Sequence, residues 1–177
     1  MRKLLIMAIF AAALAAPTAA QGRLDLGIDI PKGIGNALPS GVDASVSDFL
    51  AKAFIPFPEA AIYYQWDLGL IKIGAGARAY TVILASVAWP NAFAELDLGP
   101  LAVEAQIGGG IFAYYAVTAG GIQTGKVFFP DLSAWYAFGQ KRIFRLGCGA
   151  MGILLPNQDT SGIPFVFYLG AKAAIPI

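Results

Sequence analysis

The sequence predicts an all-β protein, an antiparallel up-and-down transmembrane β-barrel of about eight strands with a short amphipathic helix in its first long loop. Apolar and polar residues alternate with a period of two along most of the chain after residue 20. The chain is 58% hydrophobic and 13% charged. Beyond its N-terminus, however, no stretch reaches the roughly 18–20 apolar residues of a membrane-spanning helix. Tight turns alternate with longer loops, as is typical of outer-membrane barrels.

The N-terminal residues have the pattern of an export signal. Arg2 and Lys3 precede an apolar stretch over residues 4–16, and Pro17 and the small residues up to Ala20 follow it. A positive start, an apolar core and small residues at the end predict a cleaved signal peptide. We therefore expect residues 1–20 to be removed and residues 21–177 to form a single barrel domain.

Four strands are expected in the first half of the chain. Each alternates apolar residues with small, polar or charged ones, and a Gly, Pro or Asp turn signal ends each run. They cover residues 24–30, 60–68, 71–80 and 87–98. Pro90 and Asn91 interrupt the last of these, and proline in a strand favours a bulge or a strand end.

The second half predicts four more strands by the same alternation, at residues 101–115, 127–138, 142–154 and 163–175. The turns near Gly69, Gly99 and Gln140 are tight. Longer loops are expected at residues 31–58, 80–86, 118–126 and 156–162. An even number of strands places both termini on the short-turn side, which is periplasmic in outer-membrane barrels.

One segment departs from the strand period. Apolar residues recur at helical spacing near residues 42–54, and residues 40–43 fit a capping box. The sequence therefore predicts a short helix in the first long loop. It either packs over the barrel rim or caps and gates the lumen.

Polar residues recur on the alternate face of nearly every predicted strand. Because the outward face of a membrane barrel must be apolar, these residues are expected to point into the lumen. The set is Asp25, Asp29, Gln65, Asp67, Lys72, Arg78, Glu95, Asp97, Glu104, Gln106, Asp131, Ser133, Arg145 and Lys172. Such charges predict a packed core of ion pairs and hydrogen bonds or, alternatively, the lining of a narrow water-filled path.

Four outward aromatic residues, Tyr64, Trp66, Tyr115 and Tyr136, lie near predicted strand ends. Aromatic side chains at these positions suit the interfacial girdles of a membrane barrel. Ordinary sheet packing explains them equally well.

The composition gives no support to catalysis, to a cofactor or to a metal site. The chain has no histidine, which removes Ser-His and Cys-His catalysis and histidine-based metal sites. Its single cysteine, Cys148, is interpreted as a small apolar residue. Glu95 and Asp97 share one strand face, but no third ligand accompanies them. The net charge of +1 gives no reason to expect nucleic acid as a partner.

In its alternation and turn spacing over residues 21–177, the chain resembles the small eight-stranded bacterial outer-membrane barrels of the OmpA, OmpX and OmpW type. The resemblance implies a non-enzymatic protein of the cell outer membrane, either a structural or surface protein or a narrow channel for small solutes. The implied partners are outer-membrane lipid and small solutes or surface ligands, with the oligomeric state left open. The alternative is a periplasmic, lipocalin-like barrel that binds a hydrophobic ligand and keeps its apolar face inward.

Overall fold

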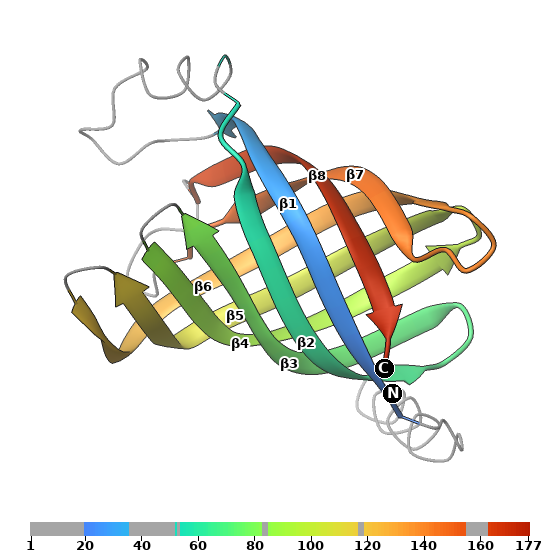
Figure 1. The fold of residues 1–177 in the computed structure, drawn as a ribbon, viewed down its shortest axis with the longest axis horizontal. Helices are drawn as coiled ribbons and strands as arrows, with labels where there is room; N and C mark the ends of the chain where they lie inside the picture. The colour runs from blue at the N-terminus through green and yellow to red at the C-terminus, as the bar shows by residue number, and fades with distance from the viewer. Residues whose placement is uncertain (1–19, 36–51, 53, 83–84, 117–118, 155–162) are drawn as a thin grey trace, which may run out of the picture.

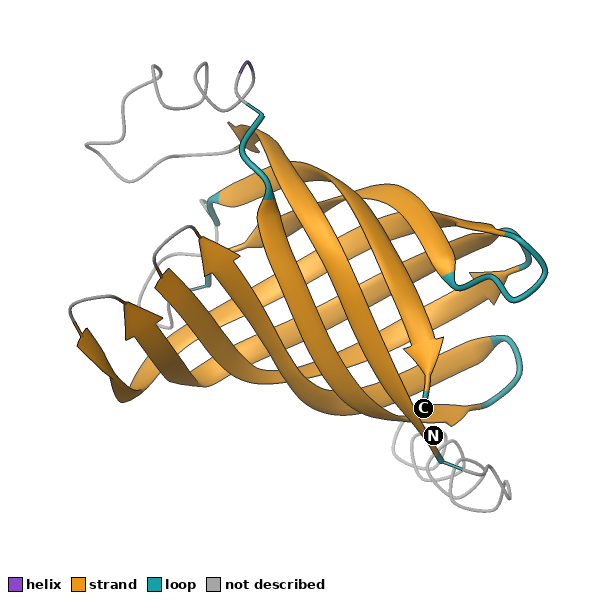
Figure 2. Ribbon diagram, viewed as in Figure 1, coloured by secondary structure: helices purple, strands orange, loops and turns teal. Residues whose placement is uncertain are grey.

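A computed structural model describes residues 20–35, 52, 54–82, 85–116, 119–154 and 163–177. The described residues form eight antiparallel strands, each paired with the next, and β1 pairs with β8 to close a barrel (Figures 1 and 2). The strands are β1 Gln21–Gly35, β2 Phe57–Asp67, β3 Ile71–Val82, β4 Ala85–Leu98, β5 Leu101–Ala116, β6 Ala119–Phe138, β7 Phe144–Gly152 and β8 Phe165–Pro176. The predicted antiparallel barrel of eight strands is confirmed.

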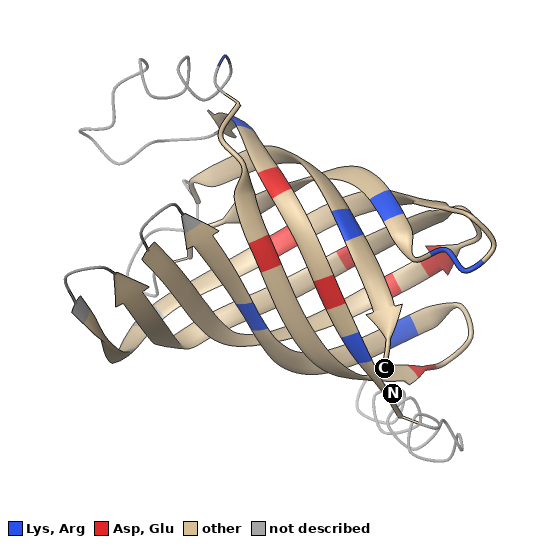
Figure 3. Cartoon of the chain, viewed as in Figure 1, with Lys and Arg blue, Asp and Glu red and all other residues tan. Residues whose placement is uncertain are grey.

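The two faces of the barrel wall differ in polarity in the way that the alternation predicts. Large apolar side chains such as Leu26, Ile62, Leu132, Leu146 and Leu169 are 46–59% exposed on the outside. Charged positions lie along the same strands (Figure 3), and most of their side chains are buried inside. Because side chains on a strand point alternately to opposite faces, one period-two pattern produces both surfaces.

Local irregularities bend the wall at three places. The β4–β5 register shifts between Ala88 and Asn91, so of the bulge or strand end expected at Pro90, the structure has the bulge. The β5–β6 register shifts at Gly110, where positive φ angles favour glycine. The third shift lies on β1 between Pro31 and Gly33. Bulges of this kind increase local twist and re-aim side chains.

Two of the predicted long loops are wrong. Strands β3 and β4 pair as far as Val82 and Ala85, and β5 and β6 pair as far as Ala116 and Ala119. Only two residues therefore separate the strands of each hairpin. The loop is expected at residues 118–126, but the backbone of residues 119–124 pairs with β5, and β6 is 20 residues long. Cross-strand pairing outweighs the low strand propensity of glycine here.

The helix predicted near residues 42–54 lies outside the described residues except for positions 52 and 54, and residues 1–19 of the expected signal peptide are not described either. Within the part of the chain that the structure covers, no helix has the length and apolar character needed to cross a membrane.

The ion-pair network inside the barrel

The inward side chains form successive layers along the barrel axis. Along β4, the inward positions are Asp97, beside a short turn at the end that holds the termini, and then Glu95, Phe93, Asn91 and Trp89. Three of these side chains are polar or charged, and the aromatic ring of Phe93 lies between Glu95 and Asn91. The other strands supply partners at matching heights, and each layer can be described in turn.

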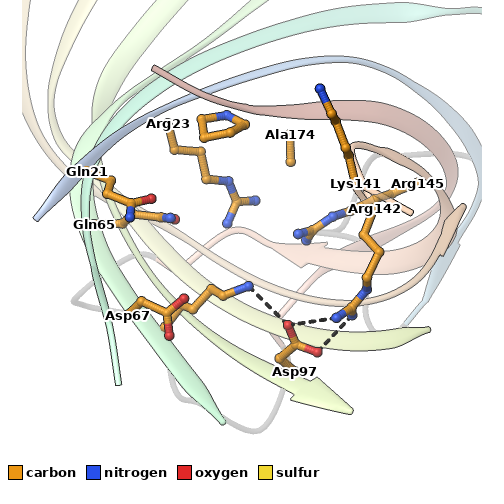
Figure 4. A pocket seen from close by; sticks show the side chains of 11 residues that line it. Gln21, Arg23, Gln65, Asp67, Asp97, Lys141, Arg142, Arg145 and Ala174 are labelled. Carbon is orange, nitrogen blue, oxygen red and sulfur yellow. Dashed lines mark hydrogen bonds and ion pairs between the residues drawn. The ribbon is translucent and has the colours of Figure 1, made fainter. Parts of the chain in front are cut away.

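The layer nearest the termini surrounds a cavity of about 260 Å³ at the barrel mouth (Figure 4). Here Asp97 accepts hydrogen bonds from Lys72 Nζ at 3.0 Å and from both terminal nitrogens of Arg142 at 2.8 and 3.1 Å. The side chains of Lys72 and Asp97 are 19% and 15% exposed. Solvent reaches this layer, so its ion pairs are only partly desolvated.

The second layer is fully buried and centres on two carboxylates, Glu95 and Glu104. Glu104, at 0% exposure, accepts hydrogen bonds from Lys172 Nζ at 2.9 and 3.0 Å and from Arg23 at 3.1 Å. Glu95 accepts hydrogen bonds from Arg23 at 2.7 Å and from Arg145 at 2.7 and 3.1 Å. Arg23 also donates twice to Asp25, at 2.6 Å each. Each of these carboxylates thus contacts more than one cation.

A third layer is built around the guanidinium of Arg78, which is 2% exposed. It donates to Asp131 at 2.7 Å and to Glu59 at 3.0 Å, and Asp29 lies 3.6 Å away. Tyr80 accepts a hydrogen bond from Arg78 and donates to Asp29 at 2.6 Å. Among the described residues, this layer therefore sets three carboxylates against one guanidinium.

Polar amides join the second and third layers. The Gln106 side-chain amide donates to Glu104, and its oxygen accepts from Arg78 at 3.1 Å and from Asn91 at 2.6 Å. Asn91 also donates to the Tyr63 hydroxyl at 2.8 Å. The buried charges consequently belong to one connected network, in which most polar groups have a partner, as buried groups require.

Aromatic side chains occupy the next layer, towards the end opposite the termini. Trp89 stacks on Tyr80 with ring centroids 5.7 Å apart, and it contacts Phe129 at 4.8 Å and Phe112 at 6.4 Å. Trp89 is 5% exposed. An eight-stranded barrel is just wide enough for side chains to fill its interior, and the ionic and aromatic layers together do so.

The structure places most of the predicted inward residues within this network. Those that are buried are Asp25, Asp29, Gln65, Arg78, Glu95, Glu104, Gln106, Asp131, Ser133, Arg145 and Lys172, while Lys72 and Asp97 are half-buried at the mouth. Asp67 differs: it is exposed at the rim and accepts a hydrogen bond from the Gly69 amide at 2.8 Å. Its position at the end of β2 makes it a turn residue.

The sequence reasoning omitted three buried polar residues, Arg23, Glu59 and Asn91. Arg23 and Glu59 lie one position before the strand starts predicted at residues 24 and 60, and each continues the inward period of its strand. Asn91 also has inward parity, but it follows Pro90, where the sequence predicts a bulge or a strand end. Extending the alternation by one residue would have found the first two.

All four predicted interfacial aromatics lie on the outer surface, where Tyr64, Trp66, Tyr115 and Tyr136 are 37–67% exposed. Tyr64 and Trp66 form an edge-on pair with centroids 5.2 Å apart. Trp66 and Tyr136 are near the short turns, whereas Tyr115 is at the far end of β5.

Among the described residues, no group of three His, Cys, Asp or Glu side chains is arranged to hold a metal ion. The inward carboxylates point instead at guanidinium and ammonium groups. What this arrangement provides is electrostatic cross-linking between strands, because each cation bonds to acids on other strands.

A closed barrel with an apolar exterior and a lumen filled by paired charges is the architecture of small outer-membrane barrels. No family model matches this chain, and no curated protein sequence matches it. Three solved structures of surface or barrel proteins are similar in fold. Neisserial surface protein A has 10% identity and a TM-score of 0.46, with 87% of this chain and 96% of that chain covered.

The other two are the N-terminal β-barrel domain of Pseudomonas aeruginosa OprF and Ail, the attachment invasion locus protein of Yersinia pestis. The OprF domain has 10% identity and a TM-score of 0.43, covering 89% of this chain and 100% of that one. Ail has 8% identity and a TM-score of 0.40, covering 88% and 99%.

Proposed function

We propose that this protein is a non-enzymatic outer-membrane barrel with a sealed lumen, which serves as a structural or surface protein rather than as a channel. In this proposal, the signal peptide of residues 1–20 directs export, and the barrel of residues 21–177 crosses the outer membrane. The apolar exterior supports the membrane location, since a surface of exposed leucine, isoleucine and phenylalanine matches lipid better than water.

The filled interior is the observation that carries the sealed-lumen proposal. The second layer contains side chains with almost no exposure, including Glu95 at 1% and Glu104 at 0%. The Arg78 layer and the aromatic layer around Trp89 follow it along the axis. An ion crossing the barrel would have to separate several desolvated ion pairs, which costs several kcal/mol for each charge exposed to a low-dielectric interior.

The orientation of the side chains argues against the lipocalin-like alternative. That class keeps an apolar cavity for its ligand and presents charges to water. In this barrel, Asp25, Glu104 and Lys172 are buried inside, while Leu26 and Leu132 are exposed outside.

The length of the β5–β6 hairpin supports a surface role. These strands contain 16 and 20 residues, whereas a tilted strand needs about 9–11 residues to cross the membrane. The excess lies at the end opposite the termini (Figure 1), which is the extracellular end in this proposal. There the hairpin would stand beyond the lipid and present Tyr115 and Ile122.

Conductance in planar lipid bilayers tests the sealed lumen. The mature protein is refolded in detergent, and a mobility difference between boiled and unboiled samples identifies the folded barrel before reconstitution. We expect no steady current above that of the bare bilayer. A stable unitary conductance from the folded, inserted protein would show that the lumen is open and would favour the narrow channel instead.

A further inference from the structure

The cavity at the barrel mouth is bordered by more cations than carboxylates (Figure 4). The second layer, next to it along the axis, is balanced, with three cations and three carboxylates: Arg23, Arg145, Lys172, Asp25, Glu95 and Glu104. Arg23 and Arg145 also line the cavity, but both donate to Glu95. The mouth layer adds three cations and two carboxylates: Lys72, Lys141, Arg142, Asp67 and Asp97. Among the described residues, the mouth therefore has a surplus of positive charge.

Lys72 and Arg142 converge on a single carboxylate. Lys72 Nζ and Arg142 Nη1 lie 3.0 and 3.1 Å from the same atom, Asp97 Oδ2. Lys72 is also 3.7 Å from Glu95, which already accepts hydrogen bonds from two arginines. Ammonium and guanidinium groups carry several N–H donors each, so both side chains keep donors beyond those that Asp97 occupies. Their side chains are 19% and 34% exposed, and a ligand from solvent can therefore reach them.

The turn between β6 and β7 brings a third cation to the mouth. Lys141 precedes Arg142 there, is exposed, and has no ion pair with any described residue. Arg142 has a φ of 51°, in the left-handed region that residues other than glycine rarely adopt. Residues held in such strained conformations cluster at binding sites. The Lys141 ammonium is turned away from Asp97 in Figure 4, but exposed side chains change rotamer within nanoseconds and can turn towards a ligand.

We infer that the mouth cavity binds a small oxyanion of the phosphate or phosphate-monoester class, held by Lys72 and Arg142 with Lys141 as a third contact. Against these three cations, Asp97 supplies one negative charge, and Asp67, which is exposed at the rim, offsets the remainder only in part. A phosphate monoester carries a charge of about −1.5 to −2 near neutral pH, which matches this surplus.

The chemistry and size of the cavity fit this class of ligand. Arginine binds phosphate oxygens through its planar fork of donors, and lysine binds them as a point charge. The cavity of about 260 Å³ has room for one such group and its bound water. The periplasmic location of this site rests on the orientation of the barrel in the proposed function, whereas the binding itself follows from the mouth residues alone.

The experiment is amide NMR of the labelled, folded barrel in a zwitterionic detergent, titrated with inorganic phosphate at constant ionic strength. The mobility difference between boiled and unboiled samples first establishes folding for every variant. We expect saturable shifts that are largest at residues 139–142 and near Asp97. Arg142→Gln should weaken phosphate binding roughly fivefold, the upper value for one partly exposed ion pair. Asp97→Asn should strengthen it, because the carboxylate that competes for Lys72 and Arg142 is then gone. Lys52→Gln, a matched change at an exposed lysine between β1 and β2, should leave it unchanged.

Lipid nanodiscs distinguish a free phosphate from a lipid headgroup as the source of the bound group. If a headgroup phosphate monoester occupies the site, inorganic phosphate should bind in discs of phosphatidylglycerol but not in discs of phosphatidic acid. If the ligand is a free phosphate, it should bind equally in both. The inference is overturned if the shifts do not saturate, or if Arg142→Gln and Asp97→Asn bind phosphate as the wild-type protein does. Failure of the proposed function is separate, because the wild-type protein would then show no heat-dependent mobility and no insertion into lipid.

Discussion

Glu104 illustrates how single residues hold the barrel interior together. Its carboxylate is fully buried and accepts hydrogen bonds from Lys172 on β8 and Arg23 on β1, and from Gln106 on its own strand. A buried charge is tolerated only when its partners are complete, and removing one partner leaves the others uncompensated. Glu104 therefore links three strands, and its substitution should weaken the contacts on all three.

We expect Glu104→Gln to lower the free energy of unfolding by about 3–5 kcal/mol, because two buried cations then lose a counter-charge. Lys172 keeps only Asp25, at 3.3 Å, and Arg23 loses one of its three carboxylate partners. Urea titration of the barrel folded in lipid vesicles measures this change. Asp97→Asn at the solvent-accessible mouth is the matched control and should cost no more than about 1 kcal/mol. Equal losses for the two variants would contradict the assigned difference in desolvation.

Adding Lys172→Met to Glu104→Gln should recover part of the loss, because replacing both partners of a buried pair by neutral groups is far less costly than removing one. A double-mutant cycle gives the coupling energy. Strict additivity of the two changes would show that the 2.9 Å contact between Lys172 and Glu104 contributes little.

The sequence reveals which face a residue occupies but not which residue it meets. Period-two alternation is local, and it places Asp25, Glu95, Glu104 and Lys172 inside from neighbouring residues alone. The contact between Arg23 and Glu104 joins positions 81 apart in the chain. Its formation depends on strand tilt and on the curvature of the whole wall, which no local pattern contains.

At the scale of single elements, the β5–β6 hairpin is the place where amino-acid composition gave a wrong prediction of secondary structure. Residues 118–125 are rich in glycine and threonine, which predicts a loop. In the barrel, the backbone of residues 119–124 is paired with β5, from Ile111–Thr124 to Ala116–Ala119. Whether these residues form a strand depends on the neighbouring strand β5, because β propensity reflects contacts across the sheet more than the residue type itself.

Gly170 on β8 tests the packing between elements inside the barrel. A Cβ atom at this position would lie 2.6 Å from Asp29 Oδ1 and 2.7 Å from Trp135 Cη2, and Trp135 is 1% exposed. Gly170→Val should therefore destabilise the barrel by about 1–3 kcal/mol through overpacking. Ala171→Val, one residue along on the outward face, is the control. The urea midpoint should fall for the first variant and stay within error for the second. Equal midpoints would mean that β8 and Trp135 shift apart freely.

At the scale of the whole molecule, closure depends on the two ends of the chain. Strand β1 pairs with β8 over a register that runs from Arg23–Pro176 to Gly35–Phe165, so the start of β1 and the end of β8 lie side by side (Figure 1). Closure removes the unpaired sheet edges that a membrane does not tolerate. It also completes the lumen, because Asp25 on β1 meets Lys172 on β8 only across this seam.

The seam can be tested by a disulfide. Leu26 and Ala173 are register partners on β1 and β8, and antiparallel partners have Cα atoms about 4.5–5.5 Å apart, within the range of a disulfide. In a Cys148→Ser background, the pair Leu26→Cys and Ala173→Cys should oxidise in the folded barrel and give a faster band on a non-reducing gel. In the control pair, Leu26→Cys and Ala94→Cys, the second cysteine lies on β4, which is not a neighbour of β1 in the barrel. This pair should not form an intramolecular disulfide. Oxidation of the control pair in the folded protein, or its absence from the seam pair, would rule out this register and with it the closed lumen on which the sealed-barrel proposal depends.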